Sequence, residues 1–378
     1  MSTPAYLDIH ALQTLPYSNV NRDDLGLPKV VEYGGRERTR VSSQSWKRAV
    51  RHQVETRLGD PAVRTRRIIA AVAERLTARG WDADLAELAG RQVVAAAGKG
   101  IKLEQDKEGQ APSTSVLLYL PAAGLDELAD LAAGYENELR AVAGKKTPKP
   151  VLPSERVAAI LRSRNATINL FGRMLAELPG ADVDGAVQFA HAFTVHGTDV
   201  ETDFFTAVDD IRGPAEDRGS GHMNVGQFSA GTFYRYANVN LSALLTNLDG
   251  DTTAARELVA EFLAAFLATV PGGKQTATAA MTIPELVYVA VRTDRPISFA
   301  PAFEKPITST HGYSAAAQSA LSSYAQNLHT LWGEEDLHYS AHAGLEAADD
   351  KLPGLGQRRP SYPALRAEAI DAAFGAER

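Results

Sequence analysis

The sequence predicts an α+β fold, because apparent strands and helices are interleaved without the regular strand–helix repeat of a doubly wound sheet. Two kinds of apolar spacing support this prediction, a period of two residues in some segments and a period of about 3.6 residues in others. The chain has 378 residues, of which 44% are hydrophobic, and this is ample for one large domain or for two.

The strands are expected where apolar residues alternate or cluster between polar segments. Leu7, Ile9 and Ala11 share one side of the segment Tyr6–Leu12. An extended segment with alternating arginines precedes Ser42. Further strands are expected at Ser115–Leu120, Val187–Val195, Gly226–Leu241 and Glu285–Thr293.

The helices are expected where apolar residues recur at helical spacing. Trp46, Val50 and Val54 place one face of a helix over Ser45–Arg57 in the core, with Ser43 as its N-cap. Interrupted strand–helix–strand units of this kind favour a ferredoxin-like core, the topology of the RNA-recognition motif, with large insertions. The other expected helices are Arg64–Arg79, Ala83–Leu88, Leu125–Ala143, Ser154–Leu178, Thr252–Thr269, Ser314–Leu331 and Tyr362–Phe374.

The composition excludes several kinds of site. The chain has no cysteine, so it forms no disulfide and offers no thiolate to zinc or to an iron–sulfur cluster. The N-terminal residues show no secretory signal pattern, and no apolar run reaches the roughly 18–20 residues that span a bilayer. We therefore expect a cytoplasmic protein without a membrane segment.

The segment Gly34–Arg51 concentrates positive charge in a chain whose net charge is −7. Like charges held close together need an anionic partner, and RNA or DNA is one such partner. Hydroxyl groups and a helix N-terminus beside the cations suit a phosphate. A solvated helix face explains the charge as well, so charge alone leaves both interpretations open. The residues concerned are Arg36, Arg38, Arg40, Ser42, Ser43, Gln44, Ser45, Lys47, Arg48 and Arg51.

The segment Pro271–Thr276, with the sequence PGGKQT, is a second candidate for ligand contact. Its glycines allow close approach of the backbone, and Lys274 and Gln275 supply donors. It is not a P-loop, because Ala268 stands where that motif needs a glycine. The alternative interpretation is the turn at a helix C-terminus with a solvated lysine.

The segment Thr198–Asn224 is acidic and predicts a charged loop or hairpin. Its acids and histidines lack the spacing of calcium or zinc ligands, so no metal site is expected. Phe204 and Phe205 lie next to each other in this polar segment. They either anchor the hairpin in the core or stack on an unpaired base. Phe233, Tyr234 and Tyr236 are expected to be mainly structural, because the RNP pattern is absent.

Several motifs, in order along the chain, give it a close resemblance to one family. The sequence resembles the backbone subunit of the type I-E CRISPR surveillance complex, Cascade, in the CasC family of the Cas-seven superfamily. The matching segments run from residue 6 to about 330. They are LDIHAL, NRDD (Asn21–Asp24), GGRERTRVSSQSWKR (Gly34–Arg48), LFGRM (Leu170–Met174), DFFTAVDD (Asp203–Asp210), FSAGTFYRYANVNL (Phe228–Leu241), PGGKQT and FEKP (Phe303–Pro306).

The resemblance implies a single hand-shaped domain. Its RNA-recognition-motif-like palm would carry helical fingers over residues 58–180 and a thumb hairpin over residues 197–226. It also implies that several copies, six in the family's assembly, line up along one CRISPR RNA together with other Cascade subunits. Guide segments would stay exposed to pair with the target DNA strand.

The resemblance further implies a subunit that is not an enzyme, needs no cofactor or metal, and grips the RNA backbone. An RNA-cutting subunit like those of type III complexes is the alternative, with Asp23 or Asp24 as the acidic residue. Phe171 and Met174 have the spacing of core residues, but the motif match lets Met174 approach the RNA. The expected RNA contacts are Asn21, Arg22, Arg36, Arg40, Ser42, Ser43, Gln44, Lys47, Arg48, Arg51, Met174, Phe204, Phe205, Lys274 and Gln275.

Overall fold

The computed structural model describes residues 5–104, 111–145, 148–207, 222–345 and 352–375. The chain forms two compact units. The first consists of Met1–Gln53, Val187–Ser242 and Thr252–Arg378, and the second of Val54–Ala186 and Ala243–Asp251. The predicted finger insertion, residues 58–180, lies within the second unit. No helix in the described ranges is long and apolar enough to cross a membrane.

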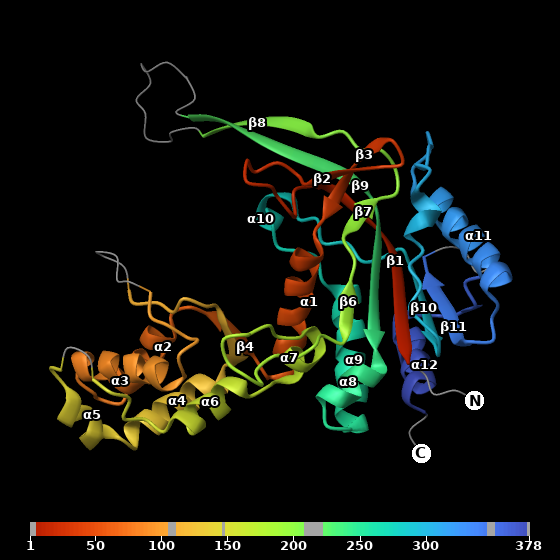
Figure 1. The fold of residues 1–378 in the computed structure, drawn as a ribbon. Coiled ribbons are helices and arrows are strands. Elements are labelled where there is room, and N and C mark those ends of the chain that lie inside the picture. Colours follow the sequence, from red (N-terminus) through yellow and green to blue (C-terminus); the bar gives the residue numbers. More distant parts are fainter. Residues whose placement is uncertain (1–4, 105–110, 146–147, 208–221, 346–351, 376–378) are drawn as a thin grey trace, which may run out of the picture. The chain divides into compact units, whose positions relative to one another are not determined.

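The first unit is built on a ten-stranded mixed sheet with the strand order β12-β11-β10-β1-β9-β7-β3-β2 (Figure 1). The short β6 and the outlying β8 also pair with β9. The pair β11–β12 is parallel, and the other pairs are antiparallel. The strands are β1 (Tyr6–Ser18), β2 (Val30–Tyr33), β3 (Arg36–Val41), β6 (Val187–Phe189), β7 (Ala192–Thr194), β8 (Glu201–Ala207), β9 (His222–Asn240), β10 (Leu286–Arg292), β11 (Leu337–Gly344) and β12 (Gln357–Arg358).

Helices of the first unit pack on this sheet through the faces that the sequence predicts. Trp46 and Val50 are fully buried, as the spacing of α1 requires. The guanidinium of Arg235, on β9, stacks on Trp46 at 3.7 Å and on Phe266 at 4.3 Å. The helices are α1 (Ser43–Leu58, which runs into the second unit), α9 (Thr252–Ala268), α10 (Gln275–Thr278), η1 (Ala300–Phe303), α11 (Ser314–Trp332) and α12 (Tyr362–Phe374).

The second unit is mainly helical, with one two-stranded sheet formed by β4 and β5. Its core is a continuous cluster of leucine, isoleucine, valine and alanine side chains from the helices and from β5. The elements are β4 (Ala62–Thr65), α2 (Ile68–Thr77), α3 (Ala83–Ala96), β5 (Leu118–Pro121), α4 (Ala123–Ala133), α5 (Glu136–Val142), α6 (Ser154–Arg162), α7 (Ala166–Phe171) and most of α8 (Leu241–Asn247).

The structure corrects the predicted start of α1. The helix begins at Ser43, and the hydroxyl of Ser42 accepts the backbone N–H of Ser45 at 3.3 Å. The N-cap is therefore Ser42, and the prediction that Ser43 holds this place was wrong. Serines at adjacent positions are equally good caps by type, so the sequence alone does not distinguish them.

Other predicted elements differ in extent. The predicted helix Ser154–Leu178 is two helices, α6 and α7, and the side chain of Asn165 caps the second by accepting the N–H of Ile168 at 2.9 Å. The predicted strand Val187–Val195 is two short strands, β6 and β7. The strands β2, β4, β11 and β12 were not predicted, because most are short and lie next to strong turn or charge signals.

A buried polar network occupies one side of β1, where the sequence predicts only an alternation with polar residues. Asp8 is fully buried and accepts hydrogen bonds from the Tyr236 hydroxyl at 2.7 Å and from the Ile297 N–H at 3.1 Å. The guanidinium of Arg292 lies 3.5 Å away. Burial raises the pKa of Asp8 to about 6, against the opposing effect of these partners.

This raised pKa predicts how stability depends on pH. Asp8 binds its proton more tightly in the folded chain, so its contribution to stability falls as the pH rises from 3.8 to about 6. The Asp8→Asn variant lacks this titration. The unfolding free energy of the wild type minus that of the variant should fall by about 2 kcal/mol between about pH 4 and about pH 7. Urea unfolding at the two pH values measures it, and a constant difference would contradict the prediction.

Candidate nucleic-acid interface

Two donor groups and one acceptor meet where β3 ends and α1 begins. The backbone N–H of Ser43 donates to Nδ1 of His191 at 3.3 Å, and Nη1 of Arg40 lies 3.4 Å from the same nitrogen. His191 reaches them from the turn between β6 and β7, because β3 pairs with β7. Since both neighbours are donors, the neutral ring must carry its proton on Nε2. The first turn of a 16-residue helix thus has a backbone N–H group beside the Arg40 guanidinium, an arrangement that suits an anion.

His191 was not found by sequence reasoning, because a single histidine between two short strands carries no local signal. Its pKa is lowered by desolvation first, and then by the charges of Arg40 and Lys29. At neutral pH the imidazole is therefore uncharged and accepts the hydrogen bonds that an anion would accept in its place. A phosphate arriving here would compete with Nδ1 for the same donors.

The titration of His191 predicts a pH dependence of RNA affinity. Protonation of Nδ1 would free the Ser43 N–H and add a cation, and a nearby phosphate would favour that protonated form. Binding then takes up protons, so affinity for single-stranded RNA should rise a few-fold between about pH 8 and about pH 6. The His191→Asn variant should lose this dependence, whereas His311→Asn, at an exposed histidine elsewhere, should keep it. An unchanged profile in His191→Asn would contradict the assignment.

The NRDD loop is attached to the start of α1 by its first residue. The side-chain oxygen of Asn21 accepts the N–H of Ser42 at 2.7 Å, so both predicted contact residues hold each other in place. Arg22, Asp23 and Asp24 are exposed. The carboxylate of Asp23 closes the loop by accepting the N–H groups of Leu25 and Leu27 at 2.9 and 2.8 Å.

The turn PGGKQT lies against the beginning of the same loop. A Cβ at Gly273 would come within 2.5 Å of the Val20 carbonyl oxygen, so only glycine permits this approach. The Lys274 ammonium lies 4.9 Å from the centre of the Phe228 ring, whose other neighbour is the stacked ring of Tyr17 at 4.3 Å. The Gln275 amide donates to the Pro271 and Ala280 carbonyls and so stabilises its own turn.

Asn19 joins these loops to the base of the β8–β9 hairpin. Its amide donates to the carbonyls of Gly26 and Gln227, each at 2.9 Å. A groove of about 520 Å³ lies here, and its lining includes the cations Lys29 and Arg40 and the acids Asp23, Asp24 and Glu37. Segments from four distant parts of the sequence therefore meet at one surface of the first unit.

The remaining predicted basic residues differ in exposure. Arg36, Gln44 and Arg48 are exposed, Lys47 is half-buried and Arg51 is buried. Arg38, from the same alternating strand, is fully buried and donates to the carbonyls of Thr194, Phe303 and Glu304. Carbonyl oxygens of the chain therefore occupy the two terminal nitrogens of this arginine, and its burial removes it from the surface that an RNA phosphate could reach.

The predicted contacts outside this surface are placed as follows. Met174 belongs to the second unit and is 89% exposed, beyond the end of α7, so its core spacing with Phe171 does not bury it. Phe204, on β8, is 66% exposed opposite Val225 of β9, so this ring is not buried in the core of the chain. The side chain of Phe205 lies outside the described residues, as do Asp209, Asp210, Arg212, Glu216, Asp217 and Arg218.

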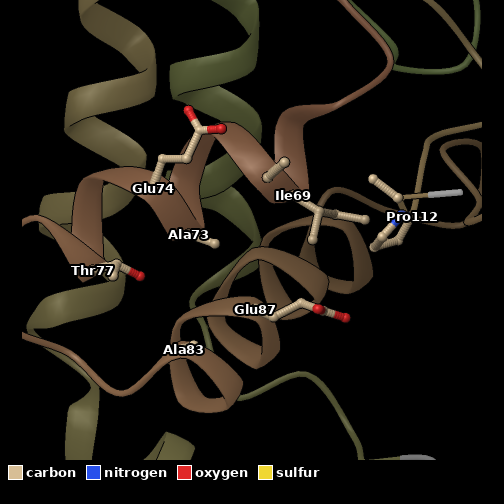
Figure 2. Close-up of a pocket in the computed structure, with 9 residues that line it drawn as sticks. Ile69, Ala73, Glu74, Thr77, Ala83, Glu87 and Pro112 are labelled. Carbon is tan, nitrogen blue, oxygen red and sulfur yellow. The ribbon is translucent and has the colours of Figure 1, made fainter. Parts of the chain in front are cut away.

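A groove of about 410 Å³ between α2 and α3 in the second unit has a different character (Figure 2). Ile69, Ala73 and Pro112 line it, with Glu74 and Glu87 beside them. Among the described residues, no arginine, lysine or aromatic ring lines this groove, so these residues offer nothing to hold a phosphate or to stack on a base.

Comparisons with known proteins agree on one family. A model of the CT1975-like protein family matches residues 7–360. A chain of a solved "CRISPR RNA-guided surveillance complex, pre-nicking" is 61% identical with a TM-score of 0.93, over 98% of this chain and 100% of that one. A chain of another "CRISPR RNA-guided surveillance complex" is 53% identical with a TM-score of 0.83, over 97% and 100%. No curated protein sequence matches.

Proposed function

The chain belongs to the CT1975-like (CasC) family of backbone subunits of CRISPR RNA-guided surveillance complexes, and on that premise we propose that it grips a CRISPR RNA through phosphates at the start of α1. One observation carries the proposal: Arg40 and the Ser43 N–H converge at an exposed helix N-terminus, where an uncharged histidine takes the anion's place. A subunit that holds any guide must contact the backbone rather than the bases.

A palm of the RNA-recognition-motif type is supported by the strand order. The strands β10, β1, β9 and β6 are neighbours in that order, with α1 following β1 and α9 preceding β10 along the chain. This is the order of a ferredoxin-like sheet. We take the second unit as the fingers and the β8–β9 hairpin as the thumb of one hand-shaped domain.

The family is non-catalytic, so the alternative of an RNA-cutting subunit does not apply. The contacts of Asp23 agree, since its carboxylate accepts two backbone N–H groups within its own loop. The partners that we propose are other copies of the chain, six in the family's assembly, and other Cascade subunits. Target DNA would be bound through the guide, in the cytoplasm.

Co-purification with RNA tests the proposal. The protein, expressed with a CRISPR array and the other complex subunits, should elute with RNA of discrete length that resists nuclease digestion. The protein should bind single-stranded RNAs of unrelated sequences with affinities similar to one another, because phosphates carry no sequence information. Elution free of RNA, or strong dependence of affinity on RNA sequence, would refute a backbone grip.

A further inference from the structure

A second pocket adjoins the start of α1 and shares Arg40 and His191 with the site described there. Its volume is about 460 Å³, and Val31, Tyr33, Phe193 and Ala300 form its apolar wall. Glu32 and Arg40 are the charged residues that line it. Arg40 also lines the groove beside the NRDD loop, so one guanidinium stands between a polar groove and an apolar, aromatic pocket.

The aromatic wall is held in place by the protein itself. The rings of Tyr33 and Phe193 meet edge to face, with centroids 5.2 Å apart and planes at 77°. The buried guanidinium of Arg38 lies 5.6 Å from the Tyr33 ring, and the Tyr33 hydroxyl donates to the Ala300 carbonyl at 3.4 Å. Both rings are half-buried, so each keeps surface available to a ligand. Such a wall needs no rearrangement to accept a flat aromatic group.

We propose that this pocket receives one unpaired base of the bound RNA, with the adjoining phosphate at Arg40 and the start of α1. The inference rests on the proposed RNA grip and adds a base-stacking site to it. Proteins hold single-stranded RNA by combining a cationic track with aromatic rings, and stacking tolerates any base. The Arg40 guanidinium can donate to a base carbonyl, and the Glu32 carboxylate can accept from an amino group.

An extended protein segment added to β2, the edge strand of the sheet, is the other occupant to consider. Such a segment would use the backbone groups of β2 and would leave Arg40 and the interior of the pocket unused. The shared arginine and the two half-buried rings favour a base.

Filling the pocket tests the inference. Val31 is 39% exposed on β2, and Val31→Trp would place an indole in the pocket without opening the core. We expect RNA affinity to fall by about 5- to 150-fold, the range for losing one stacked base. The slope of affinity against salt should stay unchanged, because no phosphate contact is lost. The control is Leu331→Trp, at a residue of α11 that is 85% exposed and outside the pocket.

Photo-crosslinking identifies the contact directly. Single-stranded RNA carrying 5-iodouridine should crosslink to Tyr33 or Phe193 in the wild type and in Leu331→Trp, and not in Val31→Trp. Phe193→Leu, which keeps an apolar side chain but removes the ring, serves as a second variant if Val31→Trp does not fold.

The outcomes separate this inference from the RNA grip. The base pocket alone would be overturned if the wild type bound RNA with a normal salt slope but gave no crosslinks to Tyr33 or Phe193, and if Val31→Trp kept full RNA affinity. A wild type that binds no RNA would overturn both proposals. If the wild type gives no crosslinks to Tyr33 or Phe193, and Val31→Trp keeps its RNA affinity but loses self-association, the base pocket would be overturned in favour of a docked protein strand.

Discussion

Charge reversal at Arg40 and Lys47 is expected to abolish binding of guide RNA while the chain stays folded. Arg40 reaches the N-terminus of α1 from β3, and Lys47 lies one turn into the helix. Replacing both by glutamate puts negative charge where phosphates must bind, and like charges at a contact are strongly unfavourable. Neither side chain is part of the buried core, so folding should be preserved.

The measurement has two parts, the RNA content of the purified protein and the salt dependence of affinity for single-stranded RNA. Single variants that neutralise one cation, Arg40→Gln or Lys47→Gln, should each lower the slope by about 0.7. The matched control reverses Arg295 and Arg358, which are exposed in the same unit and change the net charge equally. If the Arg40, Lys47 variant kept its RNA and its salt slope, the grip would have to lie elsewhere.

Replacing Phe204 by alanine is expected to impair capture of target DNA more than binding of guide RNA. The ring is 66% exposed on the β8–β9 hairpin, so its removal should change the unfolding free energy by no more than about 0.5 kcal/mol. We expect the ring to stack where the guide is splayed, which contributes about 1–3 kcal/mol per base. Without it, guide segments would no longer be presented at regular intervals.

The effect is measured as the affinity for the target strand of reconstituted complexes that contain equal amounts of RNA and carry either Phe204→Ala or a control variant. Phe204→Tyr keeps an aromatic ring and should retain target binding. Val225→Ala, opposite Phe204 on β9, removes exposed apolar surface without a ring and should also retain it. Full target affinity in a folded Phe204→Ala complex would exclude the wedge, and unfolding of Phe204→Ala would show an anchoring role that its exposure does not suggest.

The predictions made from local spacing were the most reliable. Trp46, Val50 and Val54 are all fully buried, and α9, α11 and α12 match their predicted ranges closely. The 3.6-residue period is a property of each segment and needs no distant partner. Boundaries were less reliable, as Ser42 shows, because adjacent serines offer the same capping chemistry.

The α+β class, the positions of the long helices, the concentration of cations before and within α1, and the resemblance to the CasC family could all be predicted from the sequence. The part that each side chain plays depends on contacts between distant segments, which the folded chain alone reveals. Arg38 belongs to the cation cluster of the sequence, yet it is buried and donates to Thr194, 156 residues away, and Asp8 is buried against Tyr236, 228 residues away. His191 joins Ser43 only because β7 pairs with β3. Pairing between distant strands sets burial and hydrogen-bond partners, and no local pattern records that pairing.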